Sequence, residues 1–144
     1  MSLSALPGLI IERLRDQVAG FADRVAGSAA EAKASEQTEF PLPHAFVMPA
    51  GIEPAETMIS ALDQEMIVRF RVMIAVSNAS DERGQAGTSA LYGLAADTIQ
   101  ALVAHAPTGF TPILSEGVED SFESDRRVLW GSLAFRTSIL ASEL

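Results

Sequence analysis

The apolar pattern of the chain changes from a period of two between residues 66 and 76 to helical spacing between residues 90 and 103. In the first stretch every second position is apolar: Met66, Val68, Phe70, Val72, Ile74 and Val76. A period of two predicts a long β-strand with one buried face. Arg69 and Arg71 fall on the opposite face, which must therefore reach water, an acidic neighbour or another subunit.

The second stretch predicts an amphipathic helix. Its apolar pairs recur one helical turn apart, at Ala90/Leu91, Leu94/Ala95, Thr98/Ile99 and Leu102/Val103. They form one apolar stripe about 100° wide. The connection over residues 77–84 is rich in turn formers, and Ser80 or Asp81 is expected to cap the helix. A strand, a polar turn and a helix form a unit that packs together, but this unit does not by itself indicate a catalytic or binding activity.

The N-terminal third predicts one helix, a second short one and a short strand. Pro7 is expected in the first turn of a helix, whose buried face carries Leu6, Ile10, Leu14, Val18 and Phe21. The Ser-x-x-Glu pattern at residues 28–31 is typical of a capping box. Residues 44–48 predict a strand that the Pro49–Gly51 turn closes.

The remaining segments predict further strands. Residues 57–62 are expected to pair with the long strand through a turn at Asp63 and Gln64. Residues 112–122 and 127–139 predict a hairpin, with Trp130 on the face opposite Leu129, Leu133, Phe135 and Ile139. The order of elements predicts a single α+β domain over residues 1–144, with helices on one side of a mostly antiparallel or mixed sheet.

Composition adds an expectation of self-association. The 144 residues are 48% hydrophobic, yet no uninterrupted apolar run approaches the roughly 18 residues of a membrane span. The first residues also lack the pattern of a signal peptide. Apolar surface in excess of one small core favours a buried subunit interface.

Charge and residue types exclude several kinds of chemistry. The chain has no cysteine, a net charge of −9 and a single lysine, Lys33. Thiol catalysis and disulfides are therefore excluded, and an acidic surface disfavours binding to phosphate backbones. His44 and His105 lack the spacing of a zinc helix and are interpreted as structural. The glycines of residues 84–89 could let helix amides hold an anion, but the lysine of a phosphate-binding loop is missing. We expect no catalytic residue, no metal and no cofactor.

One acidic run is ambiguous. Its members are Glu116, Glu119, Asp120, Glu123 and Asp125. The spacing does not match a calcium-binding loop, and the default interpretation is a solvated hairpin tip. Paired carboxylates for a metal-dependent enzyme remain an alternative. The arginine pairs, Arg69 with Arg71 and Arg126 with Arg127, are expected to bind carboxylates across strands or between subunits.

Three stretches together resemble the phage tail terminator proteins, also called tail completion or minor tail proteins of long-tailed phages and prophages. They read HAFVMPAG at 44–51, VRFRVMIAVSNASDERGQAGTSALYGLAADTIQALV at 68–103 and DRRVLWGSLAFRT at 125–137. Their order and spacing carry the resemblance, which extends over residues 8–139.

The resemblance implies a structural virion protein and no enzyme. It implies an α+β subunit that caps the tail tube as a ring, a hexamer, which ends tail polymerisation and forms part of the head-tail junction. The implied partners are other copies of the chain, the tail tube protein and a head-completion protein. DNA would pass through the lumen without specific binding, and no membrane is involved. The implied location is the virion tail, and the host cytoplasm during assembly.

On this interpretation two groups of residues receive roles. The charged residues expected at subunit or partner interfaces are Arg69, Arg71, Asp81, Arg83, Arg126 and Arg127. The acidic run from Glu116 to Asp125 is expected to face the lumen or solvent. The alternatives are a small metal-dependent α+β enzyme that uses this run, or another component of the tail tube.

Overall fold

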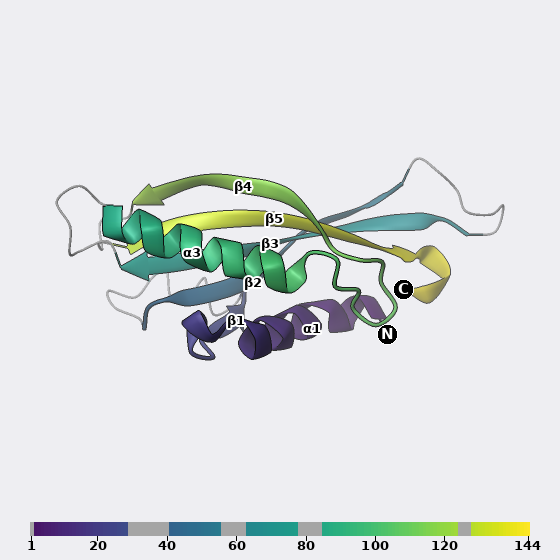
Figure 1. The fold of residues 1–144 in the computed structure, drawn as a ribbon. Helices are drawn as coiled ribbons and strands as arrows, with labels where there is room; N and C mark the ends of the chain where they lie inside the picture. Colours follow the sequence, from purple (N-terminus) through teal and green to yellow (C-terminus); the bar gives the residue numbers. More distant parts are fainter. Residues whose placement is uncertain (1, 29–40, 56–62, 78–84, 124–127) are drawn as a thin grey trace.

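One five-stranded sheet with two helices on the same side forms the fold. The computed structural model describes residues 2–28, 41–55, 63–77, 85–123 and 128–144 (Figure 1). Its elements are the helices α1 (Ser2–Gln17) and α3 (Gln85–Leu102), the strands β1 (Val25–Gly27), β2 (His44–Pro54), β3 (Glu65–Ser77), β4 (Leu114–Glu123) and β5 (Val128–Leu140), and the short 3₁₀ helices η1 (Ala19–Phe21) and η2 (Ala141–Glu143).

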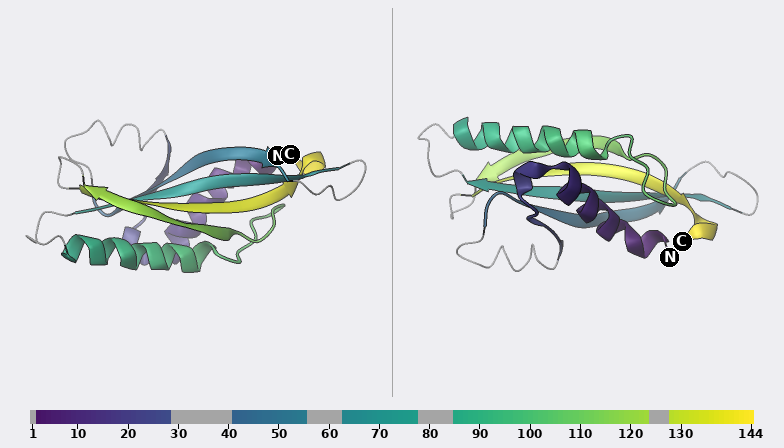
Figure 2. Two further views of the ribbon diagram at one scale, coloured as in Figure 1. Left: turned by 90° about the horizontal axis from the view of Figure 1, so that it is seen from above. Right: turned by 60° about the horizontal axis from the view of Figure 1, so that its bottom comes forward.

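The strand order is β1-β2-β3-β5-β4, and only the β1–β2 pair is parallel. The sheet is therefore mixed, and the predicted α+β class is confirmed. The two central strands, β3 and β5, pair without a register break from Glu65↔Leu140 to Ser77↔Val128. Figure 2 shows that α1 and α3 lie over one face of this sheet and leave the other face without a helix.

The predicted alternation of β3 is confirmed and explains where the core lies. Val68, Phe70, Val72, Ile74 and Val76 are buried under the helices. The predicted helical stripes face them: α1 contributes Leu6, Ile10 and Leu14, and α3 contributes Leu91, Ala95 and Leu102. The hairpin of β4 and β5 is also confirmed, and Trp130 lies in a separate cluster on the opposite face with Phe46, Ala75 and Val128.

Two boundaries differ from expectation, and both have a packing reason. Helix α1 begins at Ser2, so Pro7 lies inside it rather than in its first turn. Leu3 and Leu6 pack against the core and extend the helix towards the N-terminus. Strand β2 continues through Pro49 to Pro54 instead of ending at residue 48. A proline is tolerated there because β1 pairs only with residues 45–47 of β2, so that this part of β2 is a sheet edge.

Strand β1 was not expected at all. Its three residues are too few to show a period, and its place is decided by parallel pairing with β2. Several predictions fall outside the described residues: the helix of residues 28–31 beyond its first residue, the strand of residues 57–62, and the helix cap at Ser80 or Asp81. Within the described ranges, no helix combines the length and apolarity needed to cross a membrane.

Candidate functional site

The sheet face without helices carries a row of charged side chains. Arg69 and Arg71 point to this face because they alternate along β3 with the buried Val68, Phe70 and Val72. The sequence predicted this placement, and it also predicted that these arginines would meet carboxylates across strands. The structure identifies the carboxylates.

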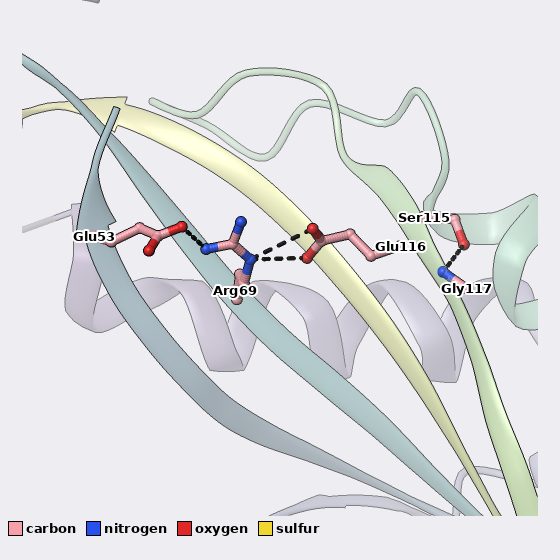
Figure 3. A network of polar contacts seen from close by, with 5 residues as sticks. All are labelled: Glu53, Arg69, Ser115, Glu116 and Gly117. Atoms are coloured by element: carbon pink, nitrogen blue, oxygen red, sulfur yellow. Dashed lines mark hydrogen bonds and ion pairs between the residues drawn. The ribbon is translucent and has the colours of Figure 1, made fainter. Parts of the chain in front are cut away.

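Arg69 joins the two outer parts of the sheet. One Nη1–H donates to Glu53 of β2, and Nε–H donates to Glu116 of β4, with 3.1 Å between Nε and Oε1 (Figure 3). The hydrogen bond to Glu53, followed by that to Glu116, holds the pKa of Arg69 above its ordinary value. One guanidinium therefore links β2, β3 and β4, although β4 is not a neighbour of β3 in the sheet.

A β-bulge in β4 places Glu116 for this contact. The register of β4 on β5 shifts between Ser115 and Gly117, which makes Glu116 the extra residue. Gly117 has a φ of +109°, a conformation that glycine adopts without steric cost. Its N–H donates to Ser115 Oγ at 3.3 Å, and Figure 3 shows this contact beside Glu116. Bulges commonly redirect a side chain in this way.

A second bulge lies on the other side of Arg69. The register of β2 on β3 shifts between Pro49 and Ile52, and Gly51 within it has a φ of +113°. The strand resumes with Glu53 opposite Ile67. The sequence analysis missed Glu53 because it placed the end of the strand before this residue. A proline and a glycine together within a strand edge are the signal that could have indicated a bulge instead of an end.

Arg71 makes the second contact across the sheet. Its Nη1–H donates to Glu119 of β4, and Ser132 Oγ of β5 lies 3.4 Å from the same nitrogen. The residue of β5 in register with Arg71 is Ala134. Small side chains at positions 132 and 134 let the arginine reach over β5 to the edge strand.

The sequence analysis placed the acidic run at the tip of a hairpin. This placement is wrong for four of its five residues, which lie in a strand. Glu116, Glu119, Asp120 and Glu123 lie within β4, and the first two are paired with arginines. The pairing supplies a physical reason, because arginines on β3 compensate carboxylates on a strand that would otherwise carry uncompensated charge. Asp125 lies outside the described residues, as do the remaining charged candidates Asp81, Arg83, Arg126 and Arg127.

Neither histidine lies in a metal-binding arrangement within the described part of the chain. The His44 ring stacks on Phe46 with 4.5 Å between ring centroids, and burial lowers its pKa. Burial, followed by the charge of Arg13, lowers the pKa of His105. Over the described residues, no group of three or more histidine, aspartate or glutamate side chains is placed to hold a metal ion.

An apolar hollow lies between α1 and the β2–β3 edge. It has a volume of about 340 Å³ and is lined by residues that include Leu3, Pro7, Pro49 and Ile52. Arg69 is the charged residue in its lining. A hollow of this composition suits an apolar contact and offers no acid, base or nucleophile.

Comparison with known proteins gives a family and a fold. The profile of the family described as "Phage tail terminator protein" matches residues 2–142. A chain from the solved structure described as "Virion of native gene transfer agent (GTA) particle" aligns with a TM-score of 0.65 and 14% identity, over 97% of this chain and 98% of that one. At this identity the likeness shows a shared fold.

A second solved structure aligns over 92% of this chain and 94% of its own, at 16% identity and a TM-score of 0.49, which is too low to establish a shared fold. No curated protein sequence matches the chain.

Proposed function

Because the chain belongs to the phage tail terminator family, we propose that it assembles into a hexameric ring that closes the end of a tail tube. As a member of this family it is a structural protein of a phage-like virion. The ring would stop tube growth at the correct length and present a surface to a head-completion protein. DNA would later pass through its lumen. The observation that carries this proposal is the family match over residues 2–142, nearly the whole chain.

The same proposal assigns the location and the partners. The subunit is made in the host cytoplasm, binds other copies of itself, and then joins the tail tube protein and a head-completion protein in the virion. Asp81, Arg83, Arg126 and Arg127 remain our candidates for charged contacts between subunits. Arg69 and Arg71 are engaged within the subunit, so we propose that they act at an interface only together with their carboxylates.

The acidic strand β4 is our candidate for the lumen. Its carboxylates would repel a phosphate backbone and let DNA slide without lasting contacts. Pairing with Arg69 and Arg71 neutralises Glu116 and Glu119, which shifts this role towards Asp120, Glu123 and Asp125. Arg69 and Arg71 would also compete with a metal ion for Glu116 and Glu119, which weighs against the alternative of a metal-dependent enzyme that uses this run.

The direct test adds the purified protein to polymerising tail tube protein and measures tube lengths by electron microscopy. We expect shorter tubes with a ring at one end, and six subunits per ring by native mass spectrometry. An equal amount of an unrelated acidic protein is the control. Unchanged tube lengths would contradict the proposal. Long polymers of this chain alone would favour a tube subunit, and a higher melting temperature with Mg²⁺ or Ca²⁺ would favour the enzyme.

A further inference from the structure

Arg136 is the one arginine in the described ranges that makes no hydrogen bond or ion pair within the chain. The other five bond to backbone carbonyls or to carboxylates: Arg13, Arg15, Arg24, Arg69 and Arg71. An unpaired cation is unexpected here, because the chain has 19 acidic residues against 10 lysines and arginines.

The position of Arg136 explains why no carboxylate reaches it. It lies on β5 directly opposite Arg69, and Leu114 of β4 lies on its other side. Arg69 takes two carboxylates, Glu53 and Glu116, and a third, Glu65, lines the same hollow as Arg136 but accepts a hydrogen bond from Ser138 Oγ at 2.6 Å. Like charges directly opposite each other on paired strands are destabilising. The Arg69–Arg136 pair therefore does not stabilise the isolated subunit.

The surroundings of Arg136 are suited to a contact with another molecule. The side chain is half-buried and lines a hollow of about 250 Å³ on the face without helices. Ile67 and Leu114 give this hollow an apolar wall, and Leu114 is 48% exposed. A partly desolvated cation beside exposed apolar side chains gains most from a carboxylate that arrives with its own apolar neighbour.

The helix layer on the opposite side of the sheet offers an exposed carboxylate. Asp97 is the single charged residue of the 18-residue helix α3. It is exposed, and it makes no hydrogen bond or ion pair with any part of the chain that the structure describes.

We propose that Arg136 of one copy binds Asp97 of the next copy. The inference rests on the proposed ring, since a ring requires a contact between two different surfaces of the same chain. Arg136 lies on the sheet face without helices, and Asp97 lies in the helix layer. These two surfaces of the subunit face in opposite directions (Figure 2). Each copy can therefore give one surface and accept the other.

Asp97 is chosen over Glu12, another exposed acidic residue of the helix layer. Glu12 lies on α1 beside Arg13 and Arg15, so a cation of a second copy would meet like charges there. Asp97 has no other charge on its helix and has one arginine beside it, Arg13 of α1, which lines the same hollow and donates its Nε–H to the carbonyl of Ala101. Glu12 therefore provides a matched control for any exchange of charges.

A charge exchange tests the contact, with assembly measured by sedimentation and native mass spectrometry over a range of concentrations. Arg136→Asp and Asp97→Arg should each raise the concentration needed for half assembly at least tenfold. The double variant Arg136→Asp/Asp97→Arg should restore assembly to within about threefold of the wild type. The control double variant Arg136→Asp/Glu12→Arg should stay impaired.

Arg136→Thr separates assembly from folding. A β-branched residue suits the strand, and it removes the like charge opposite Arg69. We expect the melting temperature of the unassembled subunit to be unchanged or higher while assembly is weakened at least tenfold. A lower melting temperature would assign Arg136 a role inside the subunit and overturn the inference.

The remaining outcomes distinguish this contact from the proposed function. Rings that form equally well with Arg136→Thr and Asp97→Arg overturn the contact and leave the ring standing. Rescue by Glu12→Arg instead of Asp97→Arg overturns the choice of carboxylate. A wild-type chain that stays monomeric at every concentration, with tail tube protein present, overturns both the contact and the proposed function.

Discussion

Gly131 of β5 sets how closely α3 approaches the sheet. A Cβ added there would lie 2.9 Å from Cδ1 of Leu91 and 3.3 Å from its Cγ. Leu91 is 1% exposed, so it has little room to move. Overpacking of a core costs about 1–3 kcal/mol, whereas replacing a strand glycine recovers only about 0.5–1 kcal/mol of backbone entropy. Because the cost of overpacking is larger than the gain in backbone entropy, adding a side chain at Gly131 should destabilise the fold.

We predict that Gly131→Ala lowers the free energy of unfolding by about 1–2 kcal/mol, measured by urea denaturation. The matched control is Gly93→Ala on the exposed side of α3, where an added Cβ meets no atom within 4 Å. This control should raise stability by up to about 1 kcal/mol through helix propensity. Equal effects of the two substitutions would show that α3 does not pack on Gly131.

Thr98 carries a buried hydroxyl in the core. The residue is 0% exposed, and its Oγ1 has no hydrogen-bond partner among the residues that the structure describes. A buried polar group without a partner retains a desolvation cost of about 1–3 kcal/mol. We predict that Thr98→Val, which keeps the shape, raises the free energy of unfolding by about 1 kcal/mol.

The control for this prediction is Thr137→Val on β5. Thr137 is also buried, but its hydroxyl donates to the carbonyl of Thr111 at 2.6 Å. The same change should therefore lower stability by about 1 kcal/mol in thermal or urea unfolding. A loss of stability in both variants would mean that the hydroxyl of Thr98 is satisfied in solution.

At the scale of elements, bulges interrupt both open edges of the sheet. Strand β4 forms one edge, and the part of β2 beyond β1 forms the other. The bulges lie at residues 115–117 and 49–52. Irregular edges discourage pairing with further strands. This favours a discrete assembly over unlimited edge-to-edge growth.

The C-terminal turn is fastened to the start of β3 by Asp63. Ser142 donates its N–H to Oδ1 at 3.0 Å and its hydroxyl to Oδ2 at 2.5 Å. The side-chain and backbone hydrogen bonds from Ser142 hold the pKa of Asp63 below its ordinary value of 3.8. Because the folded state binds its proton less readily than the unfolded state, the contact stabilises the fold above about pH 4. This contribution is lost as the pH falls through the pKa of the folded state.

We predict that the difference in unfolding free energy between the wild type and Asp63→Asn shrinks as the pH is lowered from about 6 to about 2.5. Chemical denaturation at several pH values measures it. Ser142→Ala should show a smaller difference with the same trend. A difference that is independent of pH would contradict the assigned hydrogen bonds.

At the scale of the whole molecule, the distribution of charge determines how the proposed ring would interact with DNA. The net charge is −9, and the described arginines other than Arg136 are already engaged within the chain. In the part of the chain that the structure describes, each subunit of the proposed ring therefore offers few free cations to phosphates. Reversing the same number of charges on strand β4 and on the helix layer would show which of these two surfaces DNA meets.

We predict that Glu119→Lys, Asp120→Lys and Glu123→Lys together make assembled rings retain DNA in a salt-sensitive manner. The control reverses Glu12, Asp16 and Asp23, which are exposed. Both triple variants change the net charge from −9 to −3, since each reversal adds two charges. Filter binding at increasing salt measures retention. Equal retention by both variants would place β4 away from the lumen.

The sequence by itself determined the long strand β3, the helix α3 and the β4–β5 hairpin. It also placed Arg69 and Arg71 opposite the core. These features follow from periods of 2 and 3.6 in the side chains, which are local properties of the chain. The order of three short stretches was enough to indicate the family, which the profile match confirms.

Only the tertiary structure decided which charges meet. Glu53 and Glu116 are 16 and 47 positions from Arg69, and two bulges place them on either side of it. The tertiary structure also left Arg136 without a carboxylate partner within the described ranges and added β1 beside β2. These outcomes depend on strand order and register between distant segments. A local pattern cannot specify them, because a shift of one residue turns a strand's side chains to the other face of the sheet.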